Sequence, residues 1–446
     1  MAKLTIKLIQ HSPIIHFQHE QGGATLRATE IKHYLTQYIK DIDKYYKEGF
    51  GKEIDRQISP GNGIYRISIE PSTIIERIIP KRLVGKDVSE YKYEGFGEFK
   101  DNPVTTHDQI MQHSQYFGDI KEMLTYQDPV VVTFFSFDLN ILTKVYYALP
   151  FIFALENFGT RANKGFGSFF IREQPVIDWD NSKINGKIDL NINSVLTGTH
   201  KDFYFFKTNS NRSEPYKSIF YFYNALKGGI NEDLNKKNPQ PNKYLKSLLW
   251  KYFNQTKTPS KIWEKRLIKK HLYDDIDKDP LNGNYKFLRV LLGFTPEYTF
   301  HKKPHIRMDK AYHYVDSKGK DREDEGFFDI NNDTIFYVKN PKIERSVSPI
   351  TFKPIKINGG YKVFIILKPE YYTEKLDNQE FDIRNEKFNI QDHKDDKKVT
   401  WKVTMPTIPD FDLSGFIKWA FSEINKDTSN YFIRDIKVME MDGKEV

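Results

Sequence analysis

The chain has 446 residues, with 68 Lys and Arg against 60 Asp and Glu, a formal charge of +8 and no cysteine. This length exceeds one usual hydrophobic core, so two domains or one large insertion are expected, and the missing cysteine excludes disulfides, thiolate nucleophiles and cysteine-ligated zinc. The first ten residues lack the apolar core of a signal peptide and no apolar stretch could span a bilayer, so we expect a soluble cytoplasmic protein without membrane contact.

Residues 1–175 are expected to form an α+β domain, because alternating and helix-periodic apolar patterns succeed one another. The order is β-α-β-β-α-β, which is typical of the ferredoxin-like or RRM-like unit. The sheet of such a unit is a common platform for single-stranded RNA. The predicted elements are strands at 3–10, 64–70, 130–137 and 166–172, and helices at 26–45 and 138–157.

Residues 176–446 are expected to form a second α+β domain. A helical and basic insertion is predicted at about 213–295, where Lys and aromatic residues recur. After the insertion, the pattern predicts strands at 343–357, 361–367, 399–403 and 431–439, and a helix at 413–424.

A glycine-rich loop, Gly-Thr-Arg-Ala-Asn-Lys-Gly-Phe-Gly-Ser, joins the second predicted helix to the last strand of the first domain. Gly159, Gly165 and Gly167 can adopt positive φ and approach a ligand without a Cβ, while Arg161 and Lys164 add positive charge. Common nucleotide loops instead follow a strand and open a helix. The loop therefore suits a phosphodiester backbone, although a tight turn that merely ends a helix would have the same composition.

A basic window with interleaved aromatic residues lies inside the predicted insertion. Between residues 236 and 270 there are eleven Lys or Arg and a single acid, Glu264. Cations that neutralise phosphates and aromatic faces that stack on bases are typical of single-strand-binding surfaces, which makes Trp250 and Trp263 candidates. The alternative is a pair of amphipathic helices with solvated lysines and the aromatic residues in the core.

Two histidines, His16 and His19, have a spacing that fits a metal only on a helix. Pro13 and the neighbouring β-branched residues disfavour a helix there, so we expect no metal and no cofactor. The alternative is metal-independent RNA cleavage, with His16 or His19 as the base and Lys164 stabilising the phosphate.

Several segments of the chain form a recognisable set. The most specific of them is the glycine-rich loop with its trailing Gly-Phe-Gly-Ser. The others are Leu-Thr-Ile-Lys-Leu-Ile-Gln-His-Ser-Pro at 4–13, Leu-Arg-Ala-Thr-Glu-Ile-Lys at 26–32, Phe-Gly-Thr-Arg at 158–161, and Ser-Val-Ser-Pro-Ile at 346–350 followed by Phe-Lys-Pro at 352–354. Together these segments resemble the RAMP proteins of type III CRISPR systems, and their order and spacing are most similar to the Cmr subunit numbered one of type III-B complexes.

The resemblance implies two ferredoxin-like RAMP domains and a non-catalytic subunit that holds the 3′ end of the guide RNA and the paired target RNA beside other effector subunits. Arg345 is included among the candidates because it precedes a Ser-x-Ser-Pro turn, and Arg27 and Lys32 because they lie near a helix start, which favours anions. The residues expected to contact RNA are Arg27, Lys32, Gly159, Arg161, Lys164, Gly165, Phe166, Gly167, Ser168, Trp250, Trp263 and Arg345.

Two alternatives remain open from the sequence. One is a metal-independent RAMP endoribonuclease that processes guide RNA. The other is a structural subunit whose basic insertion contacts acidic protein surfaces and never touches RNA.

Overall fold

The computed structural model describes a set of segments that together form two compact units. One unit consists of residues 1–226, 350–368 and 417–446, and the other of residues 227–349 and 369–416. Because each unit is assembled from separate segments, the domain boundary near residue 175 stays a prediction. The described residues are 1–15, 26–40, 65–78, 123–179, 184, 187–199, 201–209, 214–231, 244–256, 263–265, 285–293, 297–301, 312–315, 321–324, 333–340, 346–371, 379–385, 400–406 and 411–446.

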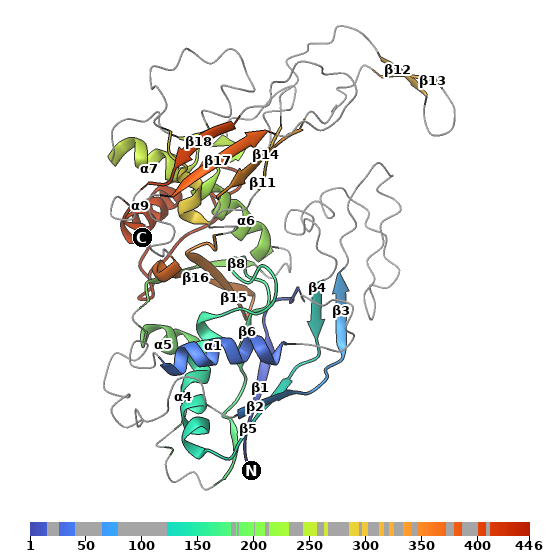
Figure 1. Ribbon diagram of the computed structural model, residues 1–446, viewed down its shortest axis with the longest axis vertical. Helices are drawn as coiled ribbons and strands as arrows, with labels where there is room; N and C mark the ends of the chain where they lie inside the picture. Colours follow the sequence, from blue (N-terminus) through green and yellow to red (C-terminus); the bar gives the residue numbers. More distant parts are fainter. Residues whose placement is uncertain are drawn as a thin grey trace. The chain divides into compact units, whose positions relative to one another are not determined.

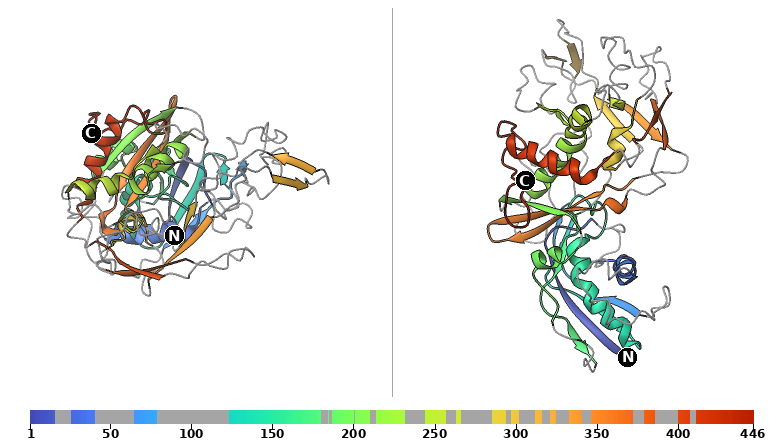
Figure 2. Two further views of the ribbon diagram at one scale, coloured as in Figure 1. Left: turned by 90° about the horizontal axis from the view of Figure 1, so that it is seen from above. Right: turned by 90° about the vertical axis from the view of Figure 1, so that its left-hand side faces the viewer.

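The N-terminal sheet of the first unit is antiparallel and has the strand order β2-β5-β1-β6, with β7 pairing the remaining length of β1. Helix α4 runs alongside β1, and α1 packs against α4 (Figures 1 and 2). Each element predicted between residues 3 and 172 has a counterpart. The counterparts are β1 (Ala2–Gln10), α1 (Ala28–Lys40), β2 (Tyr65–Ile69), β5 (Val130–Ser136), α4 (Leu139–Leu155) and β6 (Phe169–Ile171). The strand β7 (Val176–Asp178) is additional to the predicted elements.

Strict alternation in the sequence explains how this sheet is buried. In β1 and β5 every second residue is buried, and the apolar side chains among these pack with α1 and α4 in one core. Asp138 caps α4 by accepting a hydrogen bond from the N–H of Asn140 at 2.9 Å, as expected of an aspartate at that position. The helices thus cover one face of the sheet and leave the other to residues of the opposite parity.

A second antiparallel sheet of the first unit has the order β15-β16-β8. Aromatic contacts join β8 to two helices, since Phe206 stacks on Phe222 of α6 and Tyr204 meets Phe421 of α9. The first unit also contains the pair β3-β4 and the short helix α5. The bounds are β3 (Ile74–Ile78), β4 (Met123–Tyr126), α5 (Ile192–Thr197), β8 (Phe203–Asn209), α6 (Glu214–Lys227), β15 (Ile350–Ile357), β16 (Gly360–Leu367) and α9 (Leu413–Lys426).

The strand predicted at 431–439 is wrong. Residues 431–435 form a turn, and only Met439 makes a β-bridge, to Phe205. Ile433, Ile436 and Val438 are buried, so the apolar pattern of this segment reflects packing rather than strand pairing.

The second unit contains an antiparallel sheet with the order β11-β14-β17-β18 and two strand pairs, β9-β10 and β12-β13. Across the described part of the chain, no helix is long and apolar enough to cross a membrane. The remaining elements are β9 (Ile230–Asn231), β10 (Tyr244–Leu245), α7 (Leu248–Thr256), η4 (Leu288–Leu292), β11 (Glu297–His301), β12 (Tyr312–Val315), β13 (Asp321–Asp324), β14 (Asp333–Lys339), η5 (Pro369–Tyr371), β17 (Glu380–Asn385) and β18 (Thr400–Thr404).

Candidate nucleic-acid interface

The glycine-rich loop leaves the end of α4 and returns into β6. Gly159, Gly165 and Gly167 have φ of +85°, +90° and +67°, as the sequence predicts, and Arg161 also has a positive φ of +58°. A Cβ on Gly159 would lie 2.7 Å from the carbonyl oxygen of Ile15, and a Cβ on Gly167 would overlap a backbone carbonyl at 1.8 Å. The glycines are therefore required by the packing of the protein itself.

The backbone amides of this loop already have acceptors inside the protein. The N–H of Gly159 donates to Glu30 Oε1 at 2.9 Å, and that of Gly165 donates to the carbonyl of Ala162 at 3.1 Å. The two following donors bind to the end of the first strand, Gly167 to Pro13 O and Ser168 to Ser12 Oγ, both at 2.8 Å. The expectation that amides from Gly165 to Ser168 cradle phosphates does not fit these hydrogen bonds, because binding a phosphate would break them.

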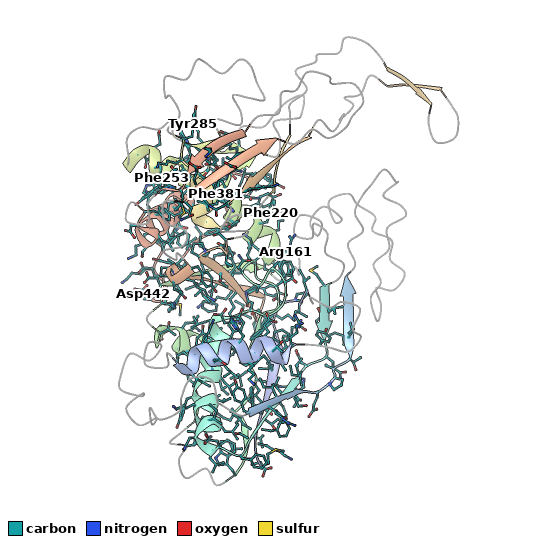
Figure 3. The ribbon with its side chains drawn as sticks, in the orientation of Figure 1. Arg161, Phe220, Phe253, Tyr285, Phe381 and Asp442 are labelled. Carbon is teal, nitrogen blue, oxygen red and sulfur yellow. The ribbon has the colours of Figure 1, made fainter. Side chains whose placement is uncertain are left out.

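Three side chains of the loop are also part of the interior. Phe166 is 1% exposed and stacks on Tyr216 with 4.6 Å between ring centroids, and Ser168 is fully buried. The buried Nζ of Lys164 lies 2.7 Å from the centroid of the Tyr223 ring. Arg161, labelled in Figure 3, is partly exposed, so RNA contact by the loop stays a prediction that depends chiefly on this residue.

A buried lysine that sequence reasoning did not select ties the loop to strand β15. The Nζ of Lys353 donates to Glu156 O at 2.8 Å, Asn157 Oδ1 at 3.2 Å and Phe169 O at 3.3 Å. Burial is the main cause that lowers the pKa of Lys353 from 10.5 to about 7. Its burial could not be inferred from the sequence, because only the structure shows that every residue from Ile350 to Ile355 is buried on both faces of the strand.

The carboxylate of Glu156 extends this network at the end of α4. Its Oε2 pairs with the Nζ of Lys368 at 2.6 Å, and its Oε1 accepts from the hydroxyl of Tyr38 at 3.0 Å. Asn157 adds two bonds from its Nδ2, to Ala162 O at 2.7 Å and Phe352 O at 2.8 Å. These contacts and those of Lys353 hold the loop against α1, β15 and β6 and make it a structural joint.

The start of α1 holds the next two candidates. The carbonyl of Arg27 accepts from the N–H groups of Glu30 and Ile31, at 3.0 and 3.1 Å, as a helix start requires. Lys32 is exposed, and its Nζ lies 5.2 Å from the centroid of the Tyr65 ring. The first turn already carries the carboxylate of Glu30, whose pKa is raised mainly by burial, so the structure adds no further argument for an anion there.

The two tryptophans of the basic window come together, with ring centroids 6.2 Å apart. Trp263 is 8% exposed and its Nε1 donates to Glu264 Oε1 at 3.0 Å, so its face is not presented for stacking. Trp250 on α7 is partly exposed, with the Nζ of Lys246 3.6 Å above its ring. For Trp263 the alternative of a core aromatic fits the structure better, whereas Trp250 stays a candidate.

Three sequence-selected residues, His16, His19 and Arg345, lie outside the described residues. Among the residues that are described, no group of three or more His, Asp or Glu is placed to hold a metal ion. His11, which is described, is buried, and its Nδ1 accepts from the N–H of Lys356 at 3.1 Å.

The face of the N-terminal sheet away from the helices carries a row of residues that sequence reasoning did not single out. Lys3 of β1 is paired with Phe135 of β5, which is paired with Arg66 of β2. Directly paired residues in antiparallel strands project from the same face, so the row is cation, aromatic ring, cation. The alternation of these strands could have identified it, but only once the pairing register was known.

The fold defines a mixed α/β protein of two compact units built on antiparallel sheets, with a glycine-rich loop fixed into the core of the first unit. The chain belongs to the Cmr1 family. The family model of the Cmr1 N-terminal domain matches residues 1–230, and that of the Cmr1 C-terminal domain matches residues 244–439.

Solved structures of low sequence identity were also found. The chain is similar to Cmr1 from Pyrococcus furiosus in its apo form, with 12% identity, a TM-score of 0.35 and 99% of both chains covered. It is also similar to a chain of the type III-B Cmr-beta complex bound to cognate target RNA, with 12% identity, a TM-score of 0.38, and 82% of this chain and 94% of that chain covered. No curated protein matches this chain.

Proposed function

We propose that this Cmr1-family chain is a non-catalytic RNA-binding subunit of a type III-B CRISPR effector complex, where it helps to hold the 3′ end of the guide RNA and the paired target RNA. Family membership over both halves of the chain supports the assignment to such a complex. The observation that carries RNA binding is the open sheet face, on which Phe135 lies between Arg66 and Lys3.

The topology of the N-terminal sheet supports a ferredoxin-like RAMP domain. The chain order β1, α1, β2, β5, α4, β6 and the sheet order β2-β5-β1-β6 are those of a split βαβ unit, with β3 and β4 added between β2 and β5. We further propose a second RAMP domain in residues 176–446, interrupted by the helical insertion at about 213–295.

The absence of catalysis is part of the proposal. Lys164, the cation required by the cleavage alternative, has its Nζ buried over Tyr223 and would have to leave that site to reach a phosphate. The protein-interaction alternative has no comparable support on the sheet face, since a cation-aromatic-cation row fits the charge and the bases of a single strand.

Binding and cleavage should be measured together on the full chain, alone and in the assembled effector complex. Labelled single-stranded RNA, single-stranded DNA and duplex RNA would be titrated across a salt series with chelator present, and the same samples examined for product. The proposal predicts RNA-preferring, salt-dependent binding without product. Metal-independent product would show a ribonuclease, and no RNA contact either alone or in the complex would contradict the RNA-binding role.

A further inference from the structure

We propose that single-stranded RNA crosses the open face of the β2-β5-β1 sheet with one base stacked on Phe135, and with the phosphates on either side near Arg66 and Lys3. The inference rests on the proposed function and names the surface that performs it. It differs from the sequence expectation, which assigned phosphate binding to the glycine-rich loop.

The ring of Phe135 is available because α1 and α4 occupy the opposite face of the sheet. The buried residues of β5 are Val130, Val132, Phe134 and Ser136, so Phe135 has the open parity, and it is partly exposed. Within the described part of the chain no aromatic ring packs on it. An aromatic side chain held on a strand offers a flat stacking surface with little conformational freedom left to lose.

The two cations flank that ring from the neighbouring strands. Lys3 and Arg66 are both exposed, and no ion pair among the described residues takes up either charge. Their backbones are separated by two strand spacings, or about 10 Å. A base stacked between them therefore has its preceding and following phosphates within reach of a long basic side chain on each side.

The next row along the sheet is polar and uncharged. Thr5, Thr133 and Ser68 are paired across the same three strands, and the hydroxyls of the two threonines lie 3.2 Å apart. Hydroxyl groups can both donate and accept, so this row can bind a base edge or a ribose 2′-hydroxyl, the group that distinguishes RNA from DNA.

Two acidic residues limit the path of the RNA on the side of β1 that faces away from β5. Asp178 of β7 is paired with Lys3, and Glu173 forms an ion pair with Lys7 at 2.8 Å. Phosphates are disfavoured beside these carboxylates, so the phosphate near Lys3 is expected on the β5 side of that side chain. The RNA strand is then expected to run from Lys3 across β5 toward β2 rather than toward β7.

The test compares Phe135→Leu with Phe135→Tyr in the full chain, using labelled single-stranded RNA. Leu keeps an apolar side chain at the site but has no ring, whereas Tyr keeps the stacking face. Loss of one stacked base is expected to weaken binding roughly 5- to 150-fold for Phe135→Leu, and Phe135→Tyr should bind like the wild type. Thermal unfolding of each variant would verify that the fold is unchanged.

Arg66→Ala and Lys3→Ala should each reduce the slope of log affinity against log salt by about 0.7, the value for one contact to a single strand. The matched control is Lys426→Ala, because Lys426 on α9 has a side chain that is 70% exposed and belongs to the same unit. That control should leave the slope unchanged.

Crosslinking of the wild-type chain to RNA that contains 4-thiouridine gives a second readout that needs no variant. The expected crosslinks map to β5 and β2. Wild-type binding that is unaffected by Phe135→Leu, with crosslinks elsewhere, would overturn the sheet-face site and leave the proposed function standing. Absence of RNA binding by the wild type would overturn the proposed RNA-binding function instead. If Phe135→Leu failed to assemble into the effector complex and the wild type gave no RNA crosslink, the sheet face would be a protein-docking surface.

Discussion

Replacing Gly167 by alanine tests whether the glycine-rich loop is a structural joint. The new Cβ would lie 1.8 Å from the carbonyl oxygen of Phe158, at a residue whose φ is +67°. The matched control is Gly443→Ala, because Gly443 has φ of +85° with nothing within 4 Å of its Cβ position. Both substitutions impose an unfavourable φ, and only the first imposes an overlap with the backbone.

The expected loss of unfolding free energy follows from the backbone shift that the new Cβ requires. An alanine at positive φ costs about 1 kcal/mol, and this is the whole effect expected for Gly443→Ala. In Gly167→Ala the overlap also separates residue 167 from Phe158 and Pro13, to which it is bound by hydrogen bonds of 2.9 and 2.8 Å. Leaving these buried groups unpaired costs about 1–3 kcal/mol each, so the total is about 3–7 kcal/mol.

Urea unfolding followed by circular dichroism would measure both variants against the wild type. A clearly lower midpoint is expected for Gly167→Ala and a small change for Gly443→Ala. Equal losses of unfolding free energy in the two variants would show that the overlap with Phe158 does not exist in solution.

Three further predictions concern buried groups. The pKa of Lys353 is lowered to about 7, so between about pH 7 and 10.5 its side chain holds a proton only in the unfolded chain. The free energy of unfolding should therefore rise with pH in that range. Lys353→Met should reduce this rise by up to about 1.4 kcal/mol per pH unit in urea unfolding at pH 7, 8 and 9. An identical rise in the variant would contradict a lowered pKa of Lys353 in the folded chain. The pKa of His11 is lowered from 6.5 to about 3, mainly by burial and further by Lys353 and Lys356. Below pH 6.5 only the unfolded chain gains this proton, so the free energy of unfolding should fall with pH. His11→Asn should therefore show a smaller drop in thermal midpoint between pH 7 and 4.5. Trp263→Phe should lower stability, through the lost bond to Glu264, while the RNA affinity of the folded variant stays unchanged in the same titrations; a large loss of affinity would place Trp263 on the RNA.

Local patterns in the sequence predicted the N-terminal sheet well because its causes are local. The alternation in residues 3–10 and 130–137 states which side chains face a core, and Asp138 marks the start of α4. The positive φ values of the loop glycines were likewise predictable, because glycine populates that region without strain.

The features that the sequence could not predict depend on contacts between segments that are distant in the chain. The amides of Gly159, Gly167 and Ser168 have acceptors more than 120 residues away in the chain, so they looked free when only the loop was considered. These acceptors are Glu30, Pro13 and Ser12. Lys353 resembled a solvated lysine until its three acceptors in another segment were known. The sheet-face row depends in the same way on the pairing register of β2, β5 and β1.

Side-chain footprinting of the full chain, with and without single-stranded RNA, would show directly whether RNA lies on the open sheet face. Hydroxyl radicals oxidise exposed aromatic rings, and mass spectrometry locates each modified residue. RNA is expected to protect Phe135 on the open sheet face, while the buried Phe166 of the glycine-rich loop is expected to be unreactive in both states. Protection elsewhere with no change at Phe135, under conditions where RNA is bound, would contradict RNA binding on the sheet face.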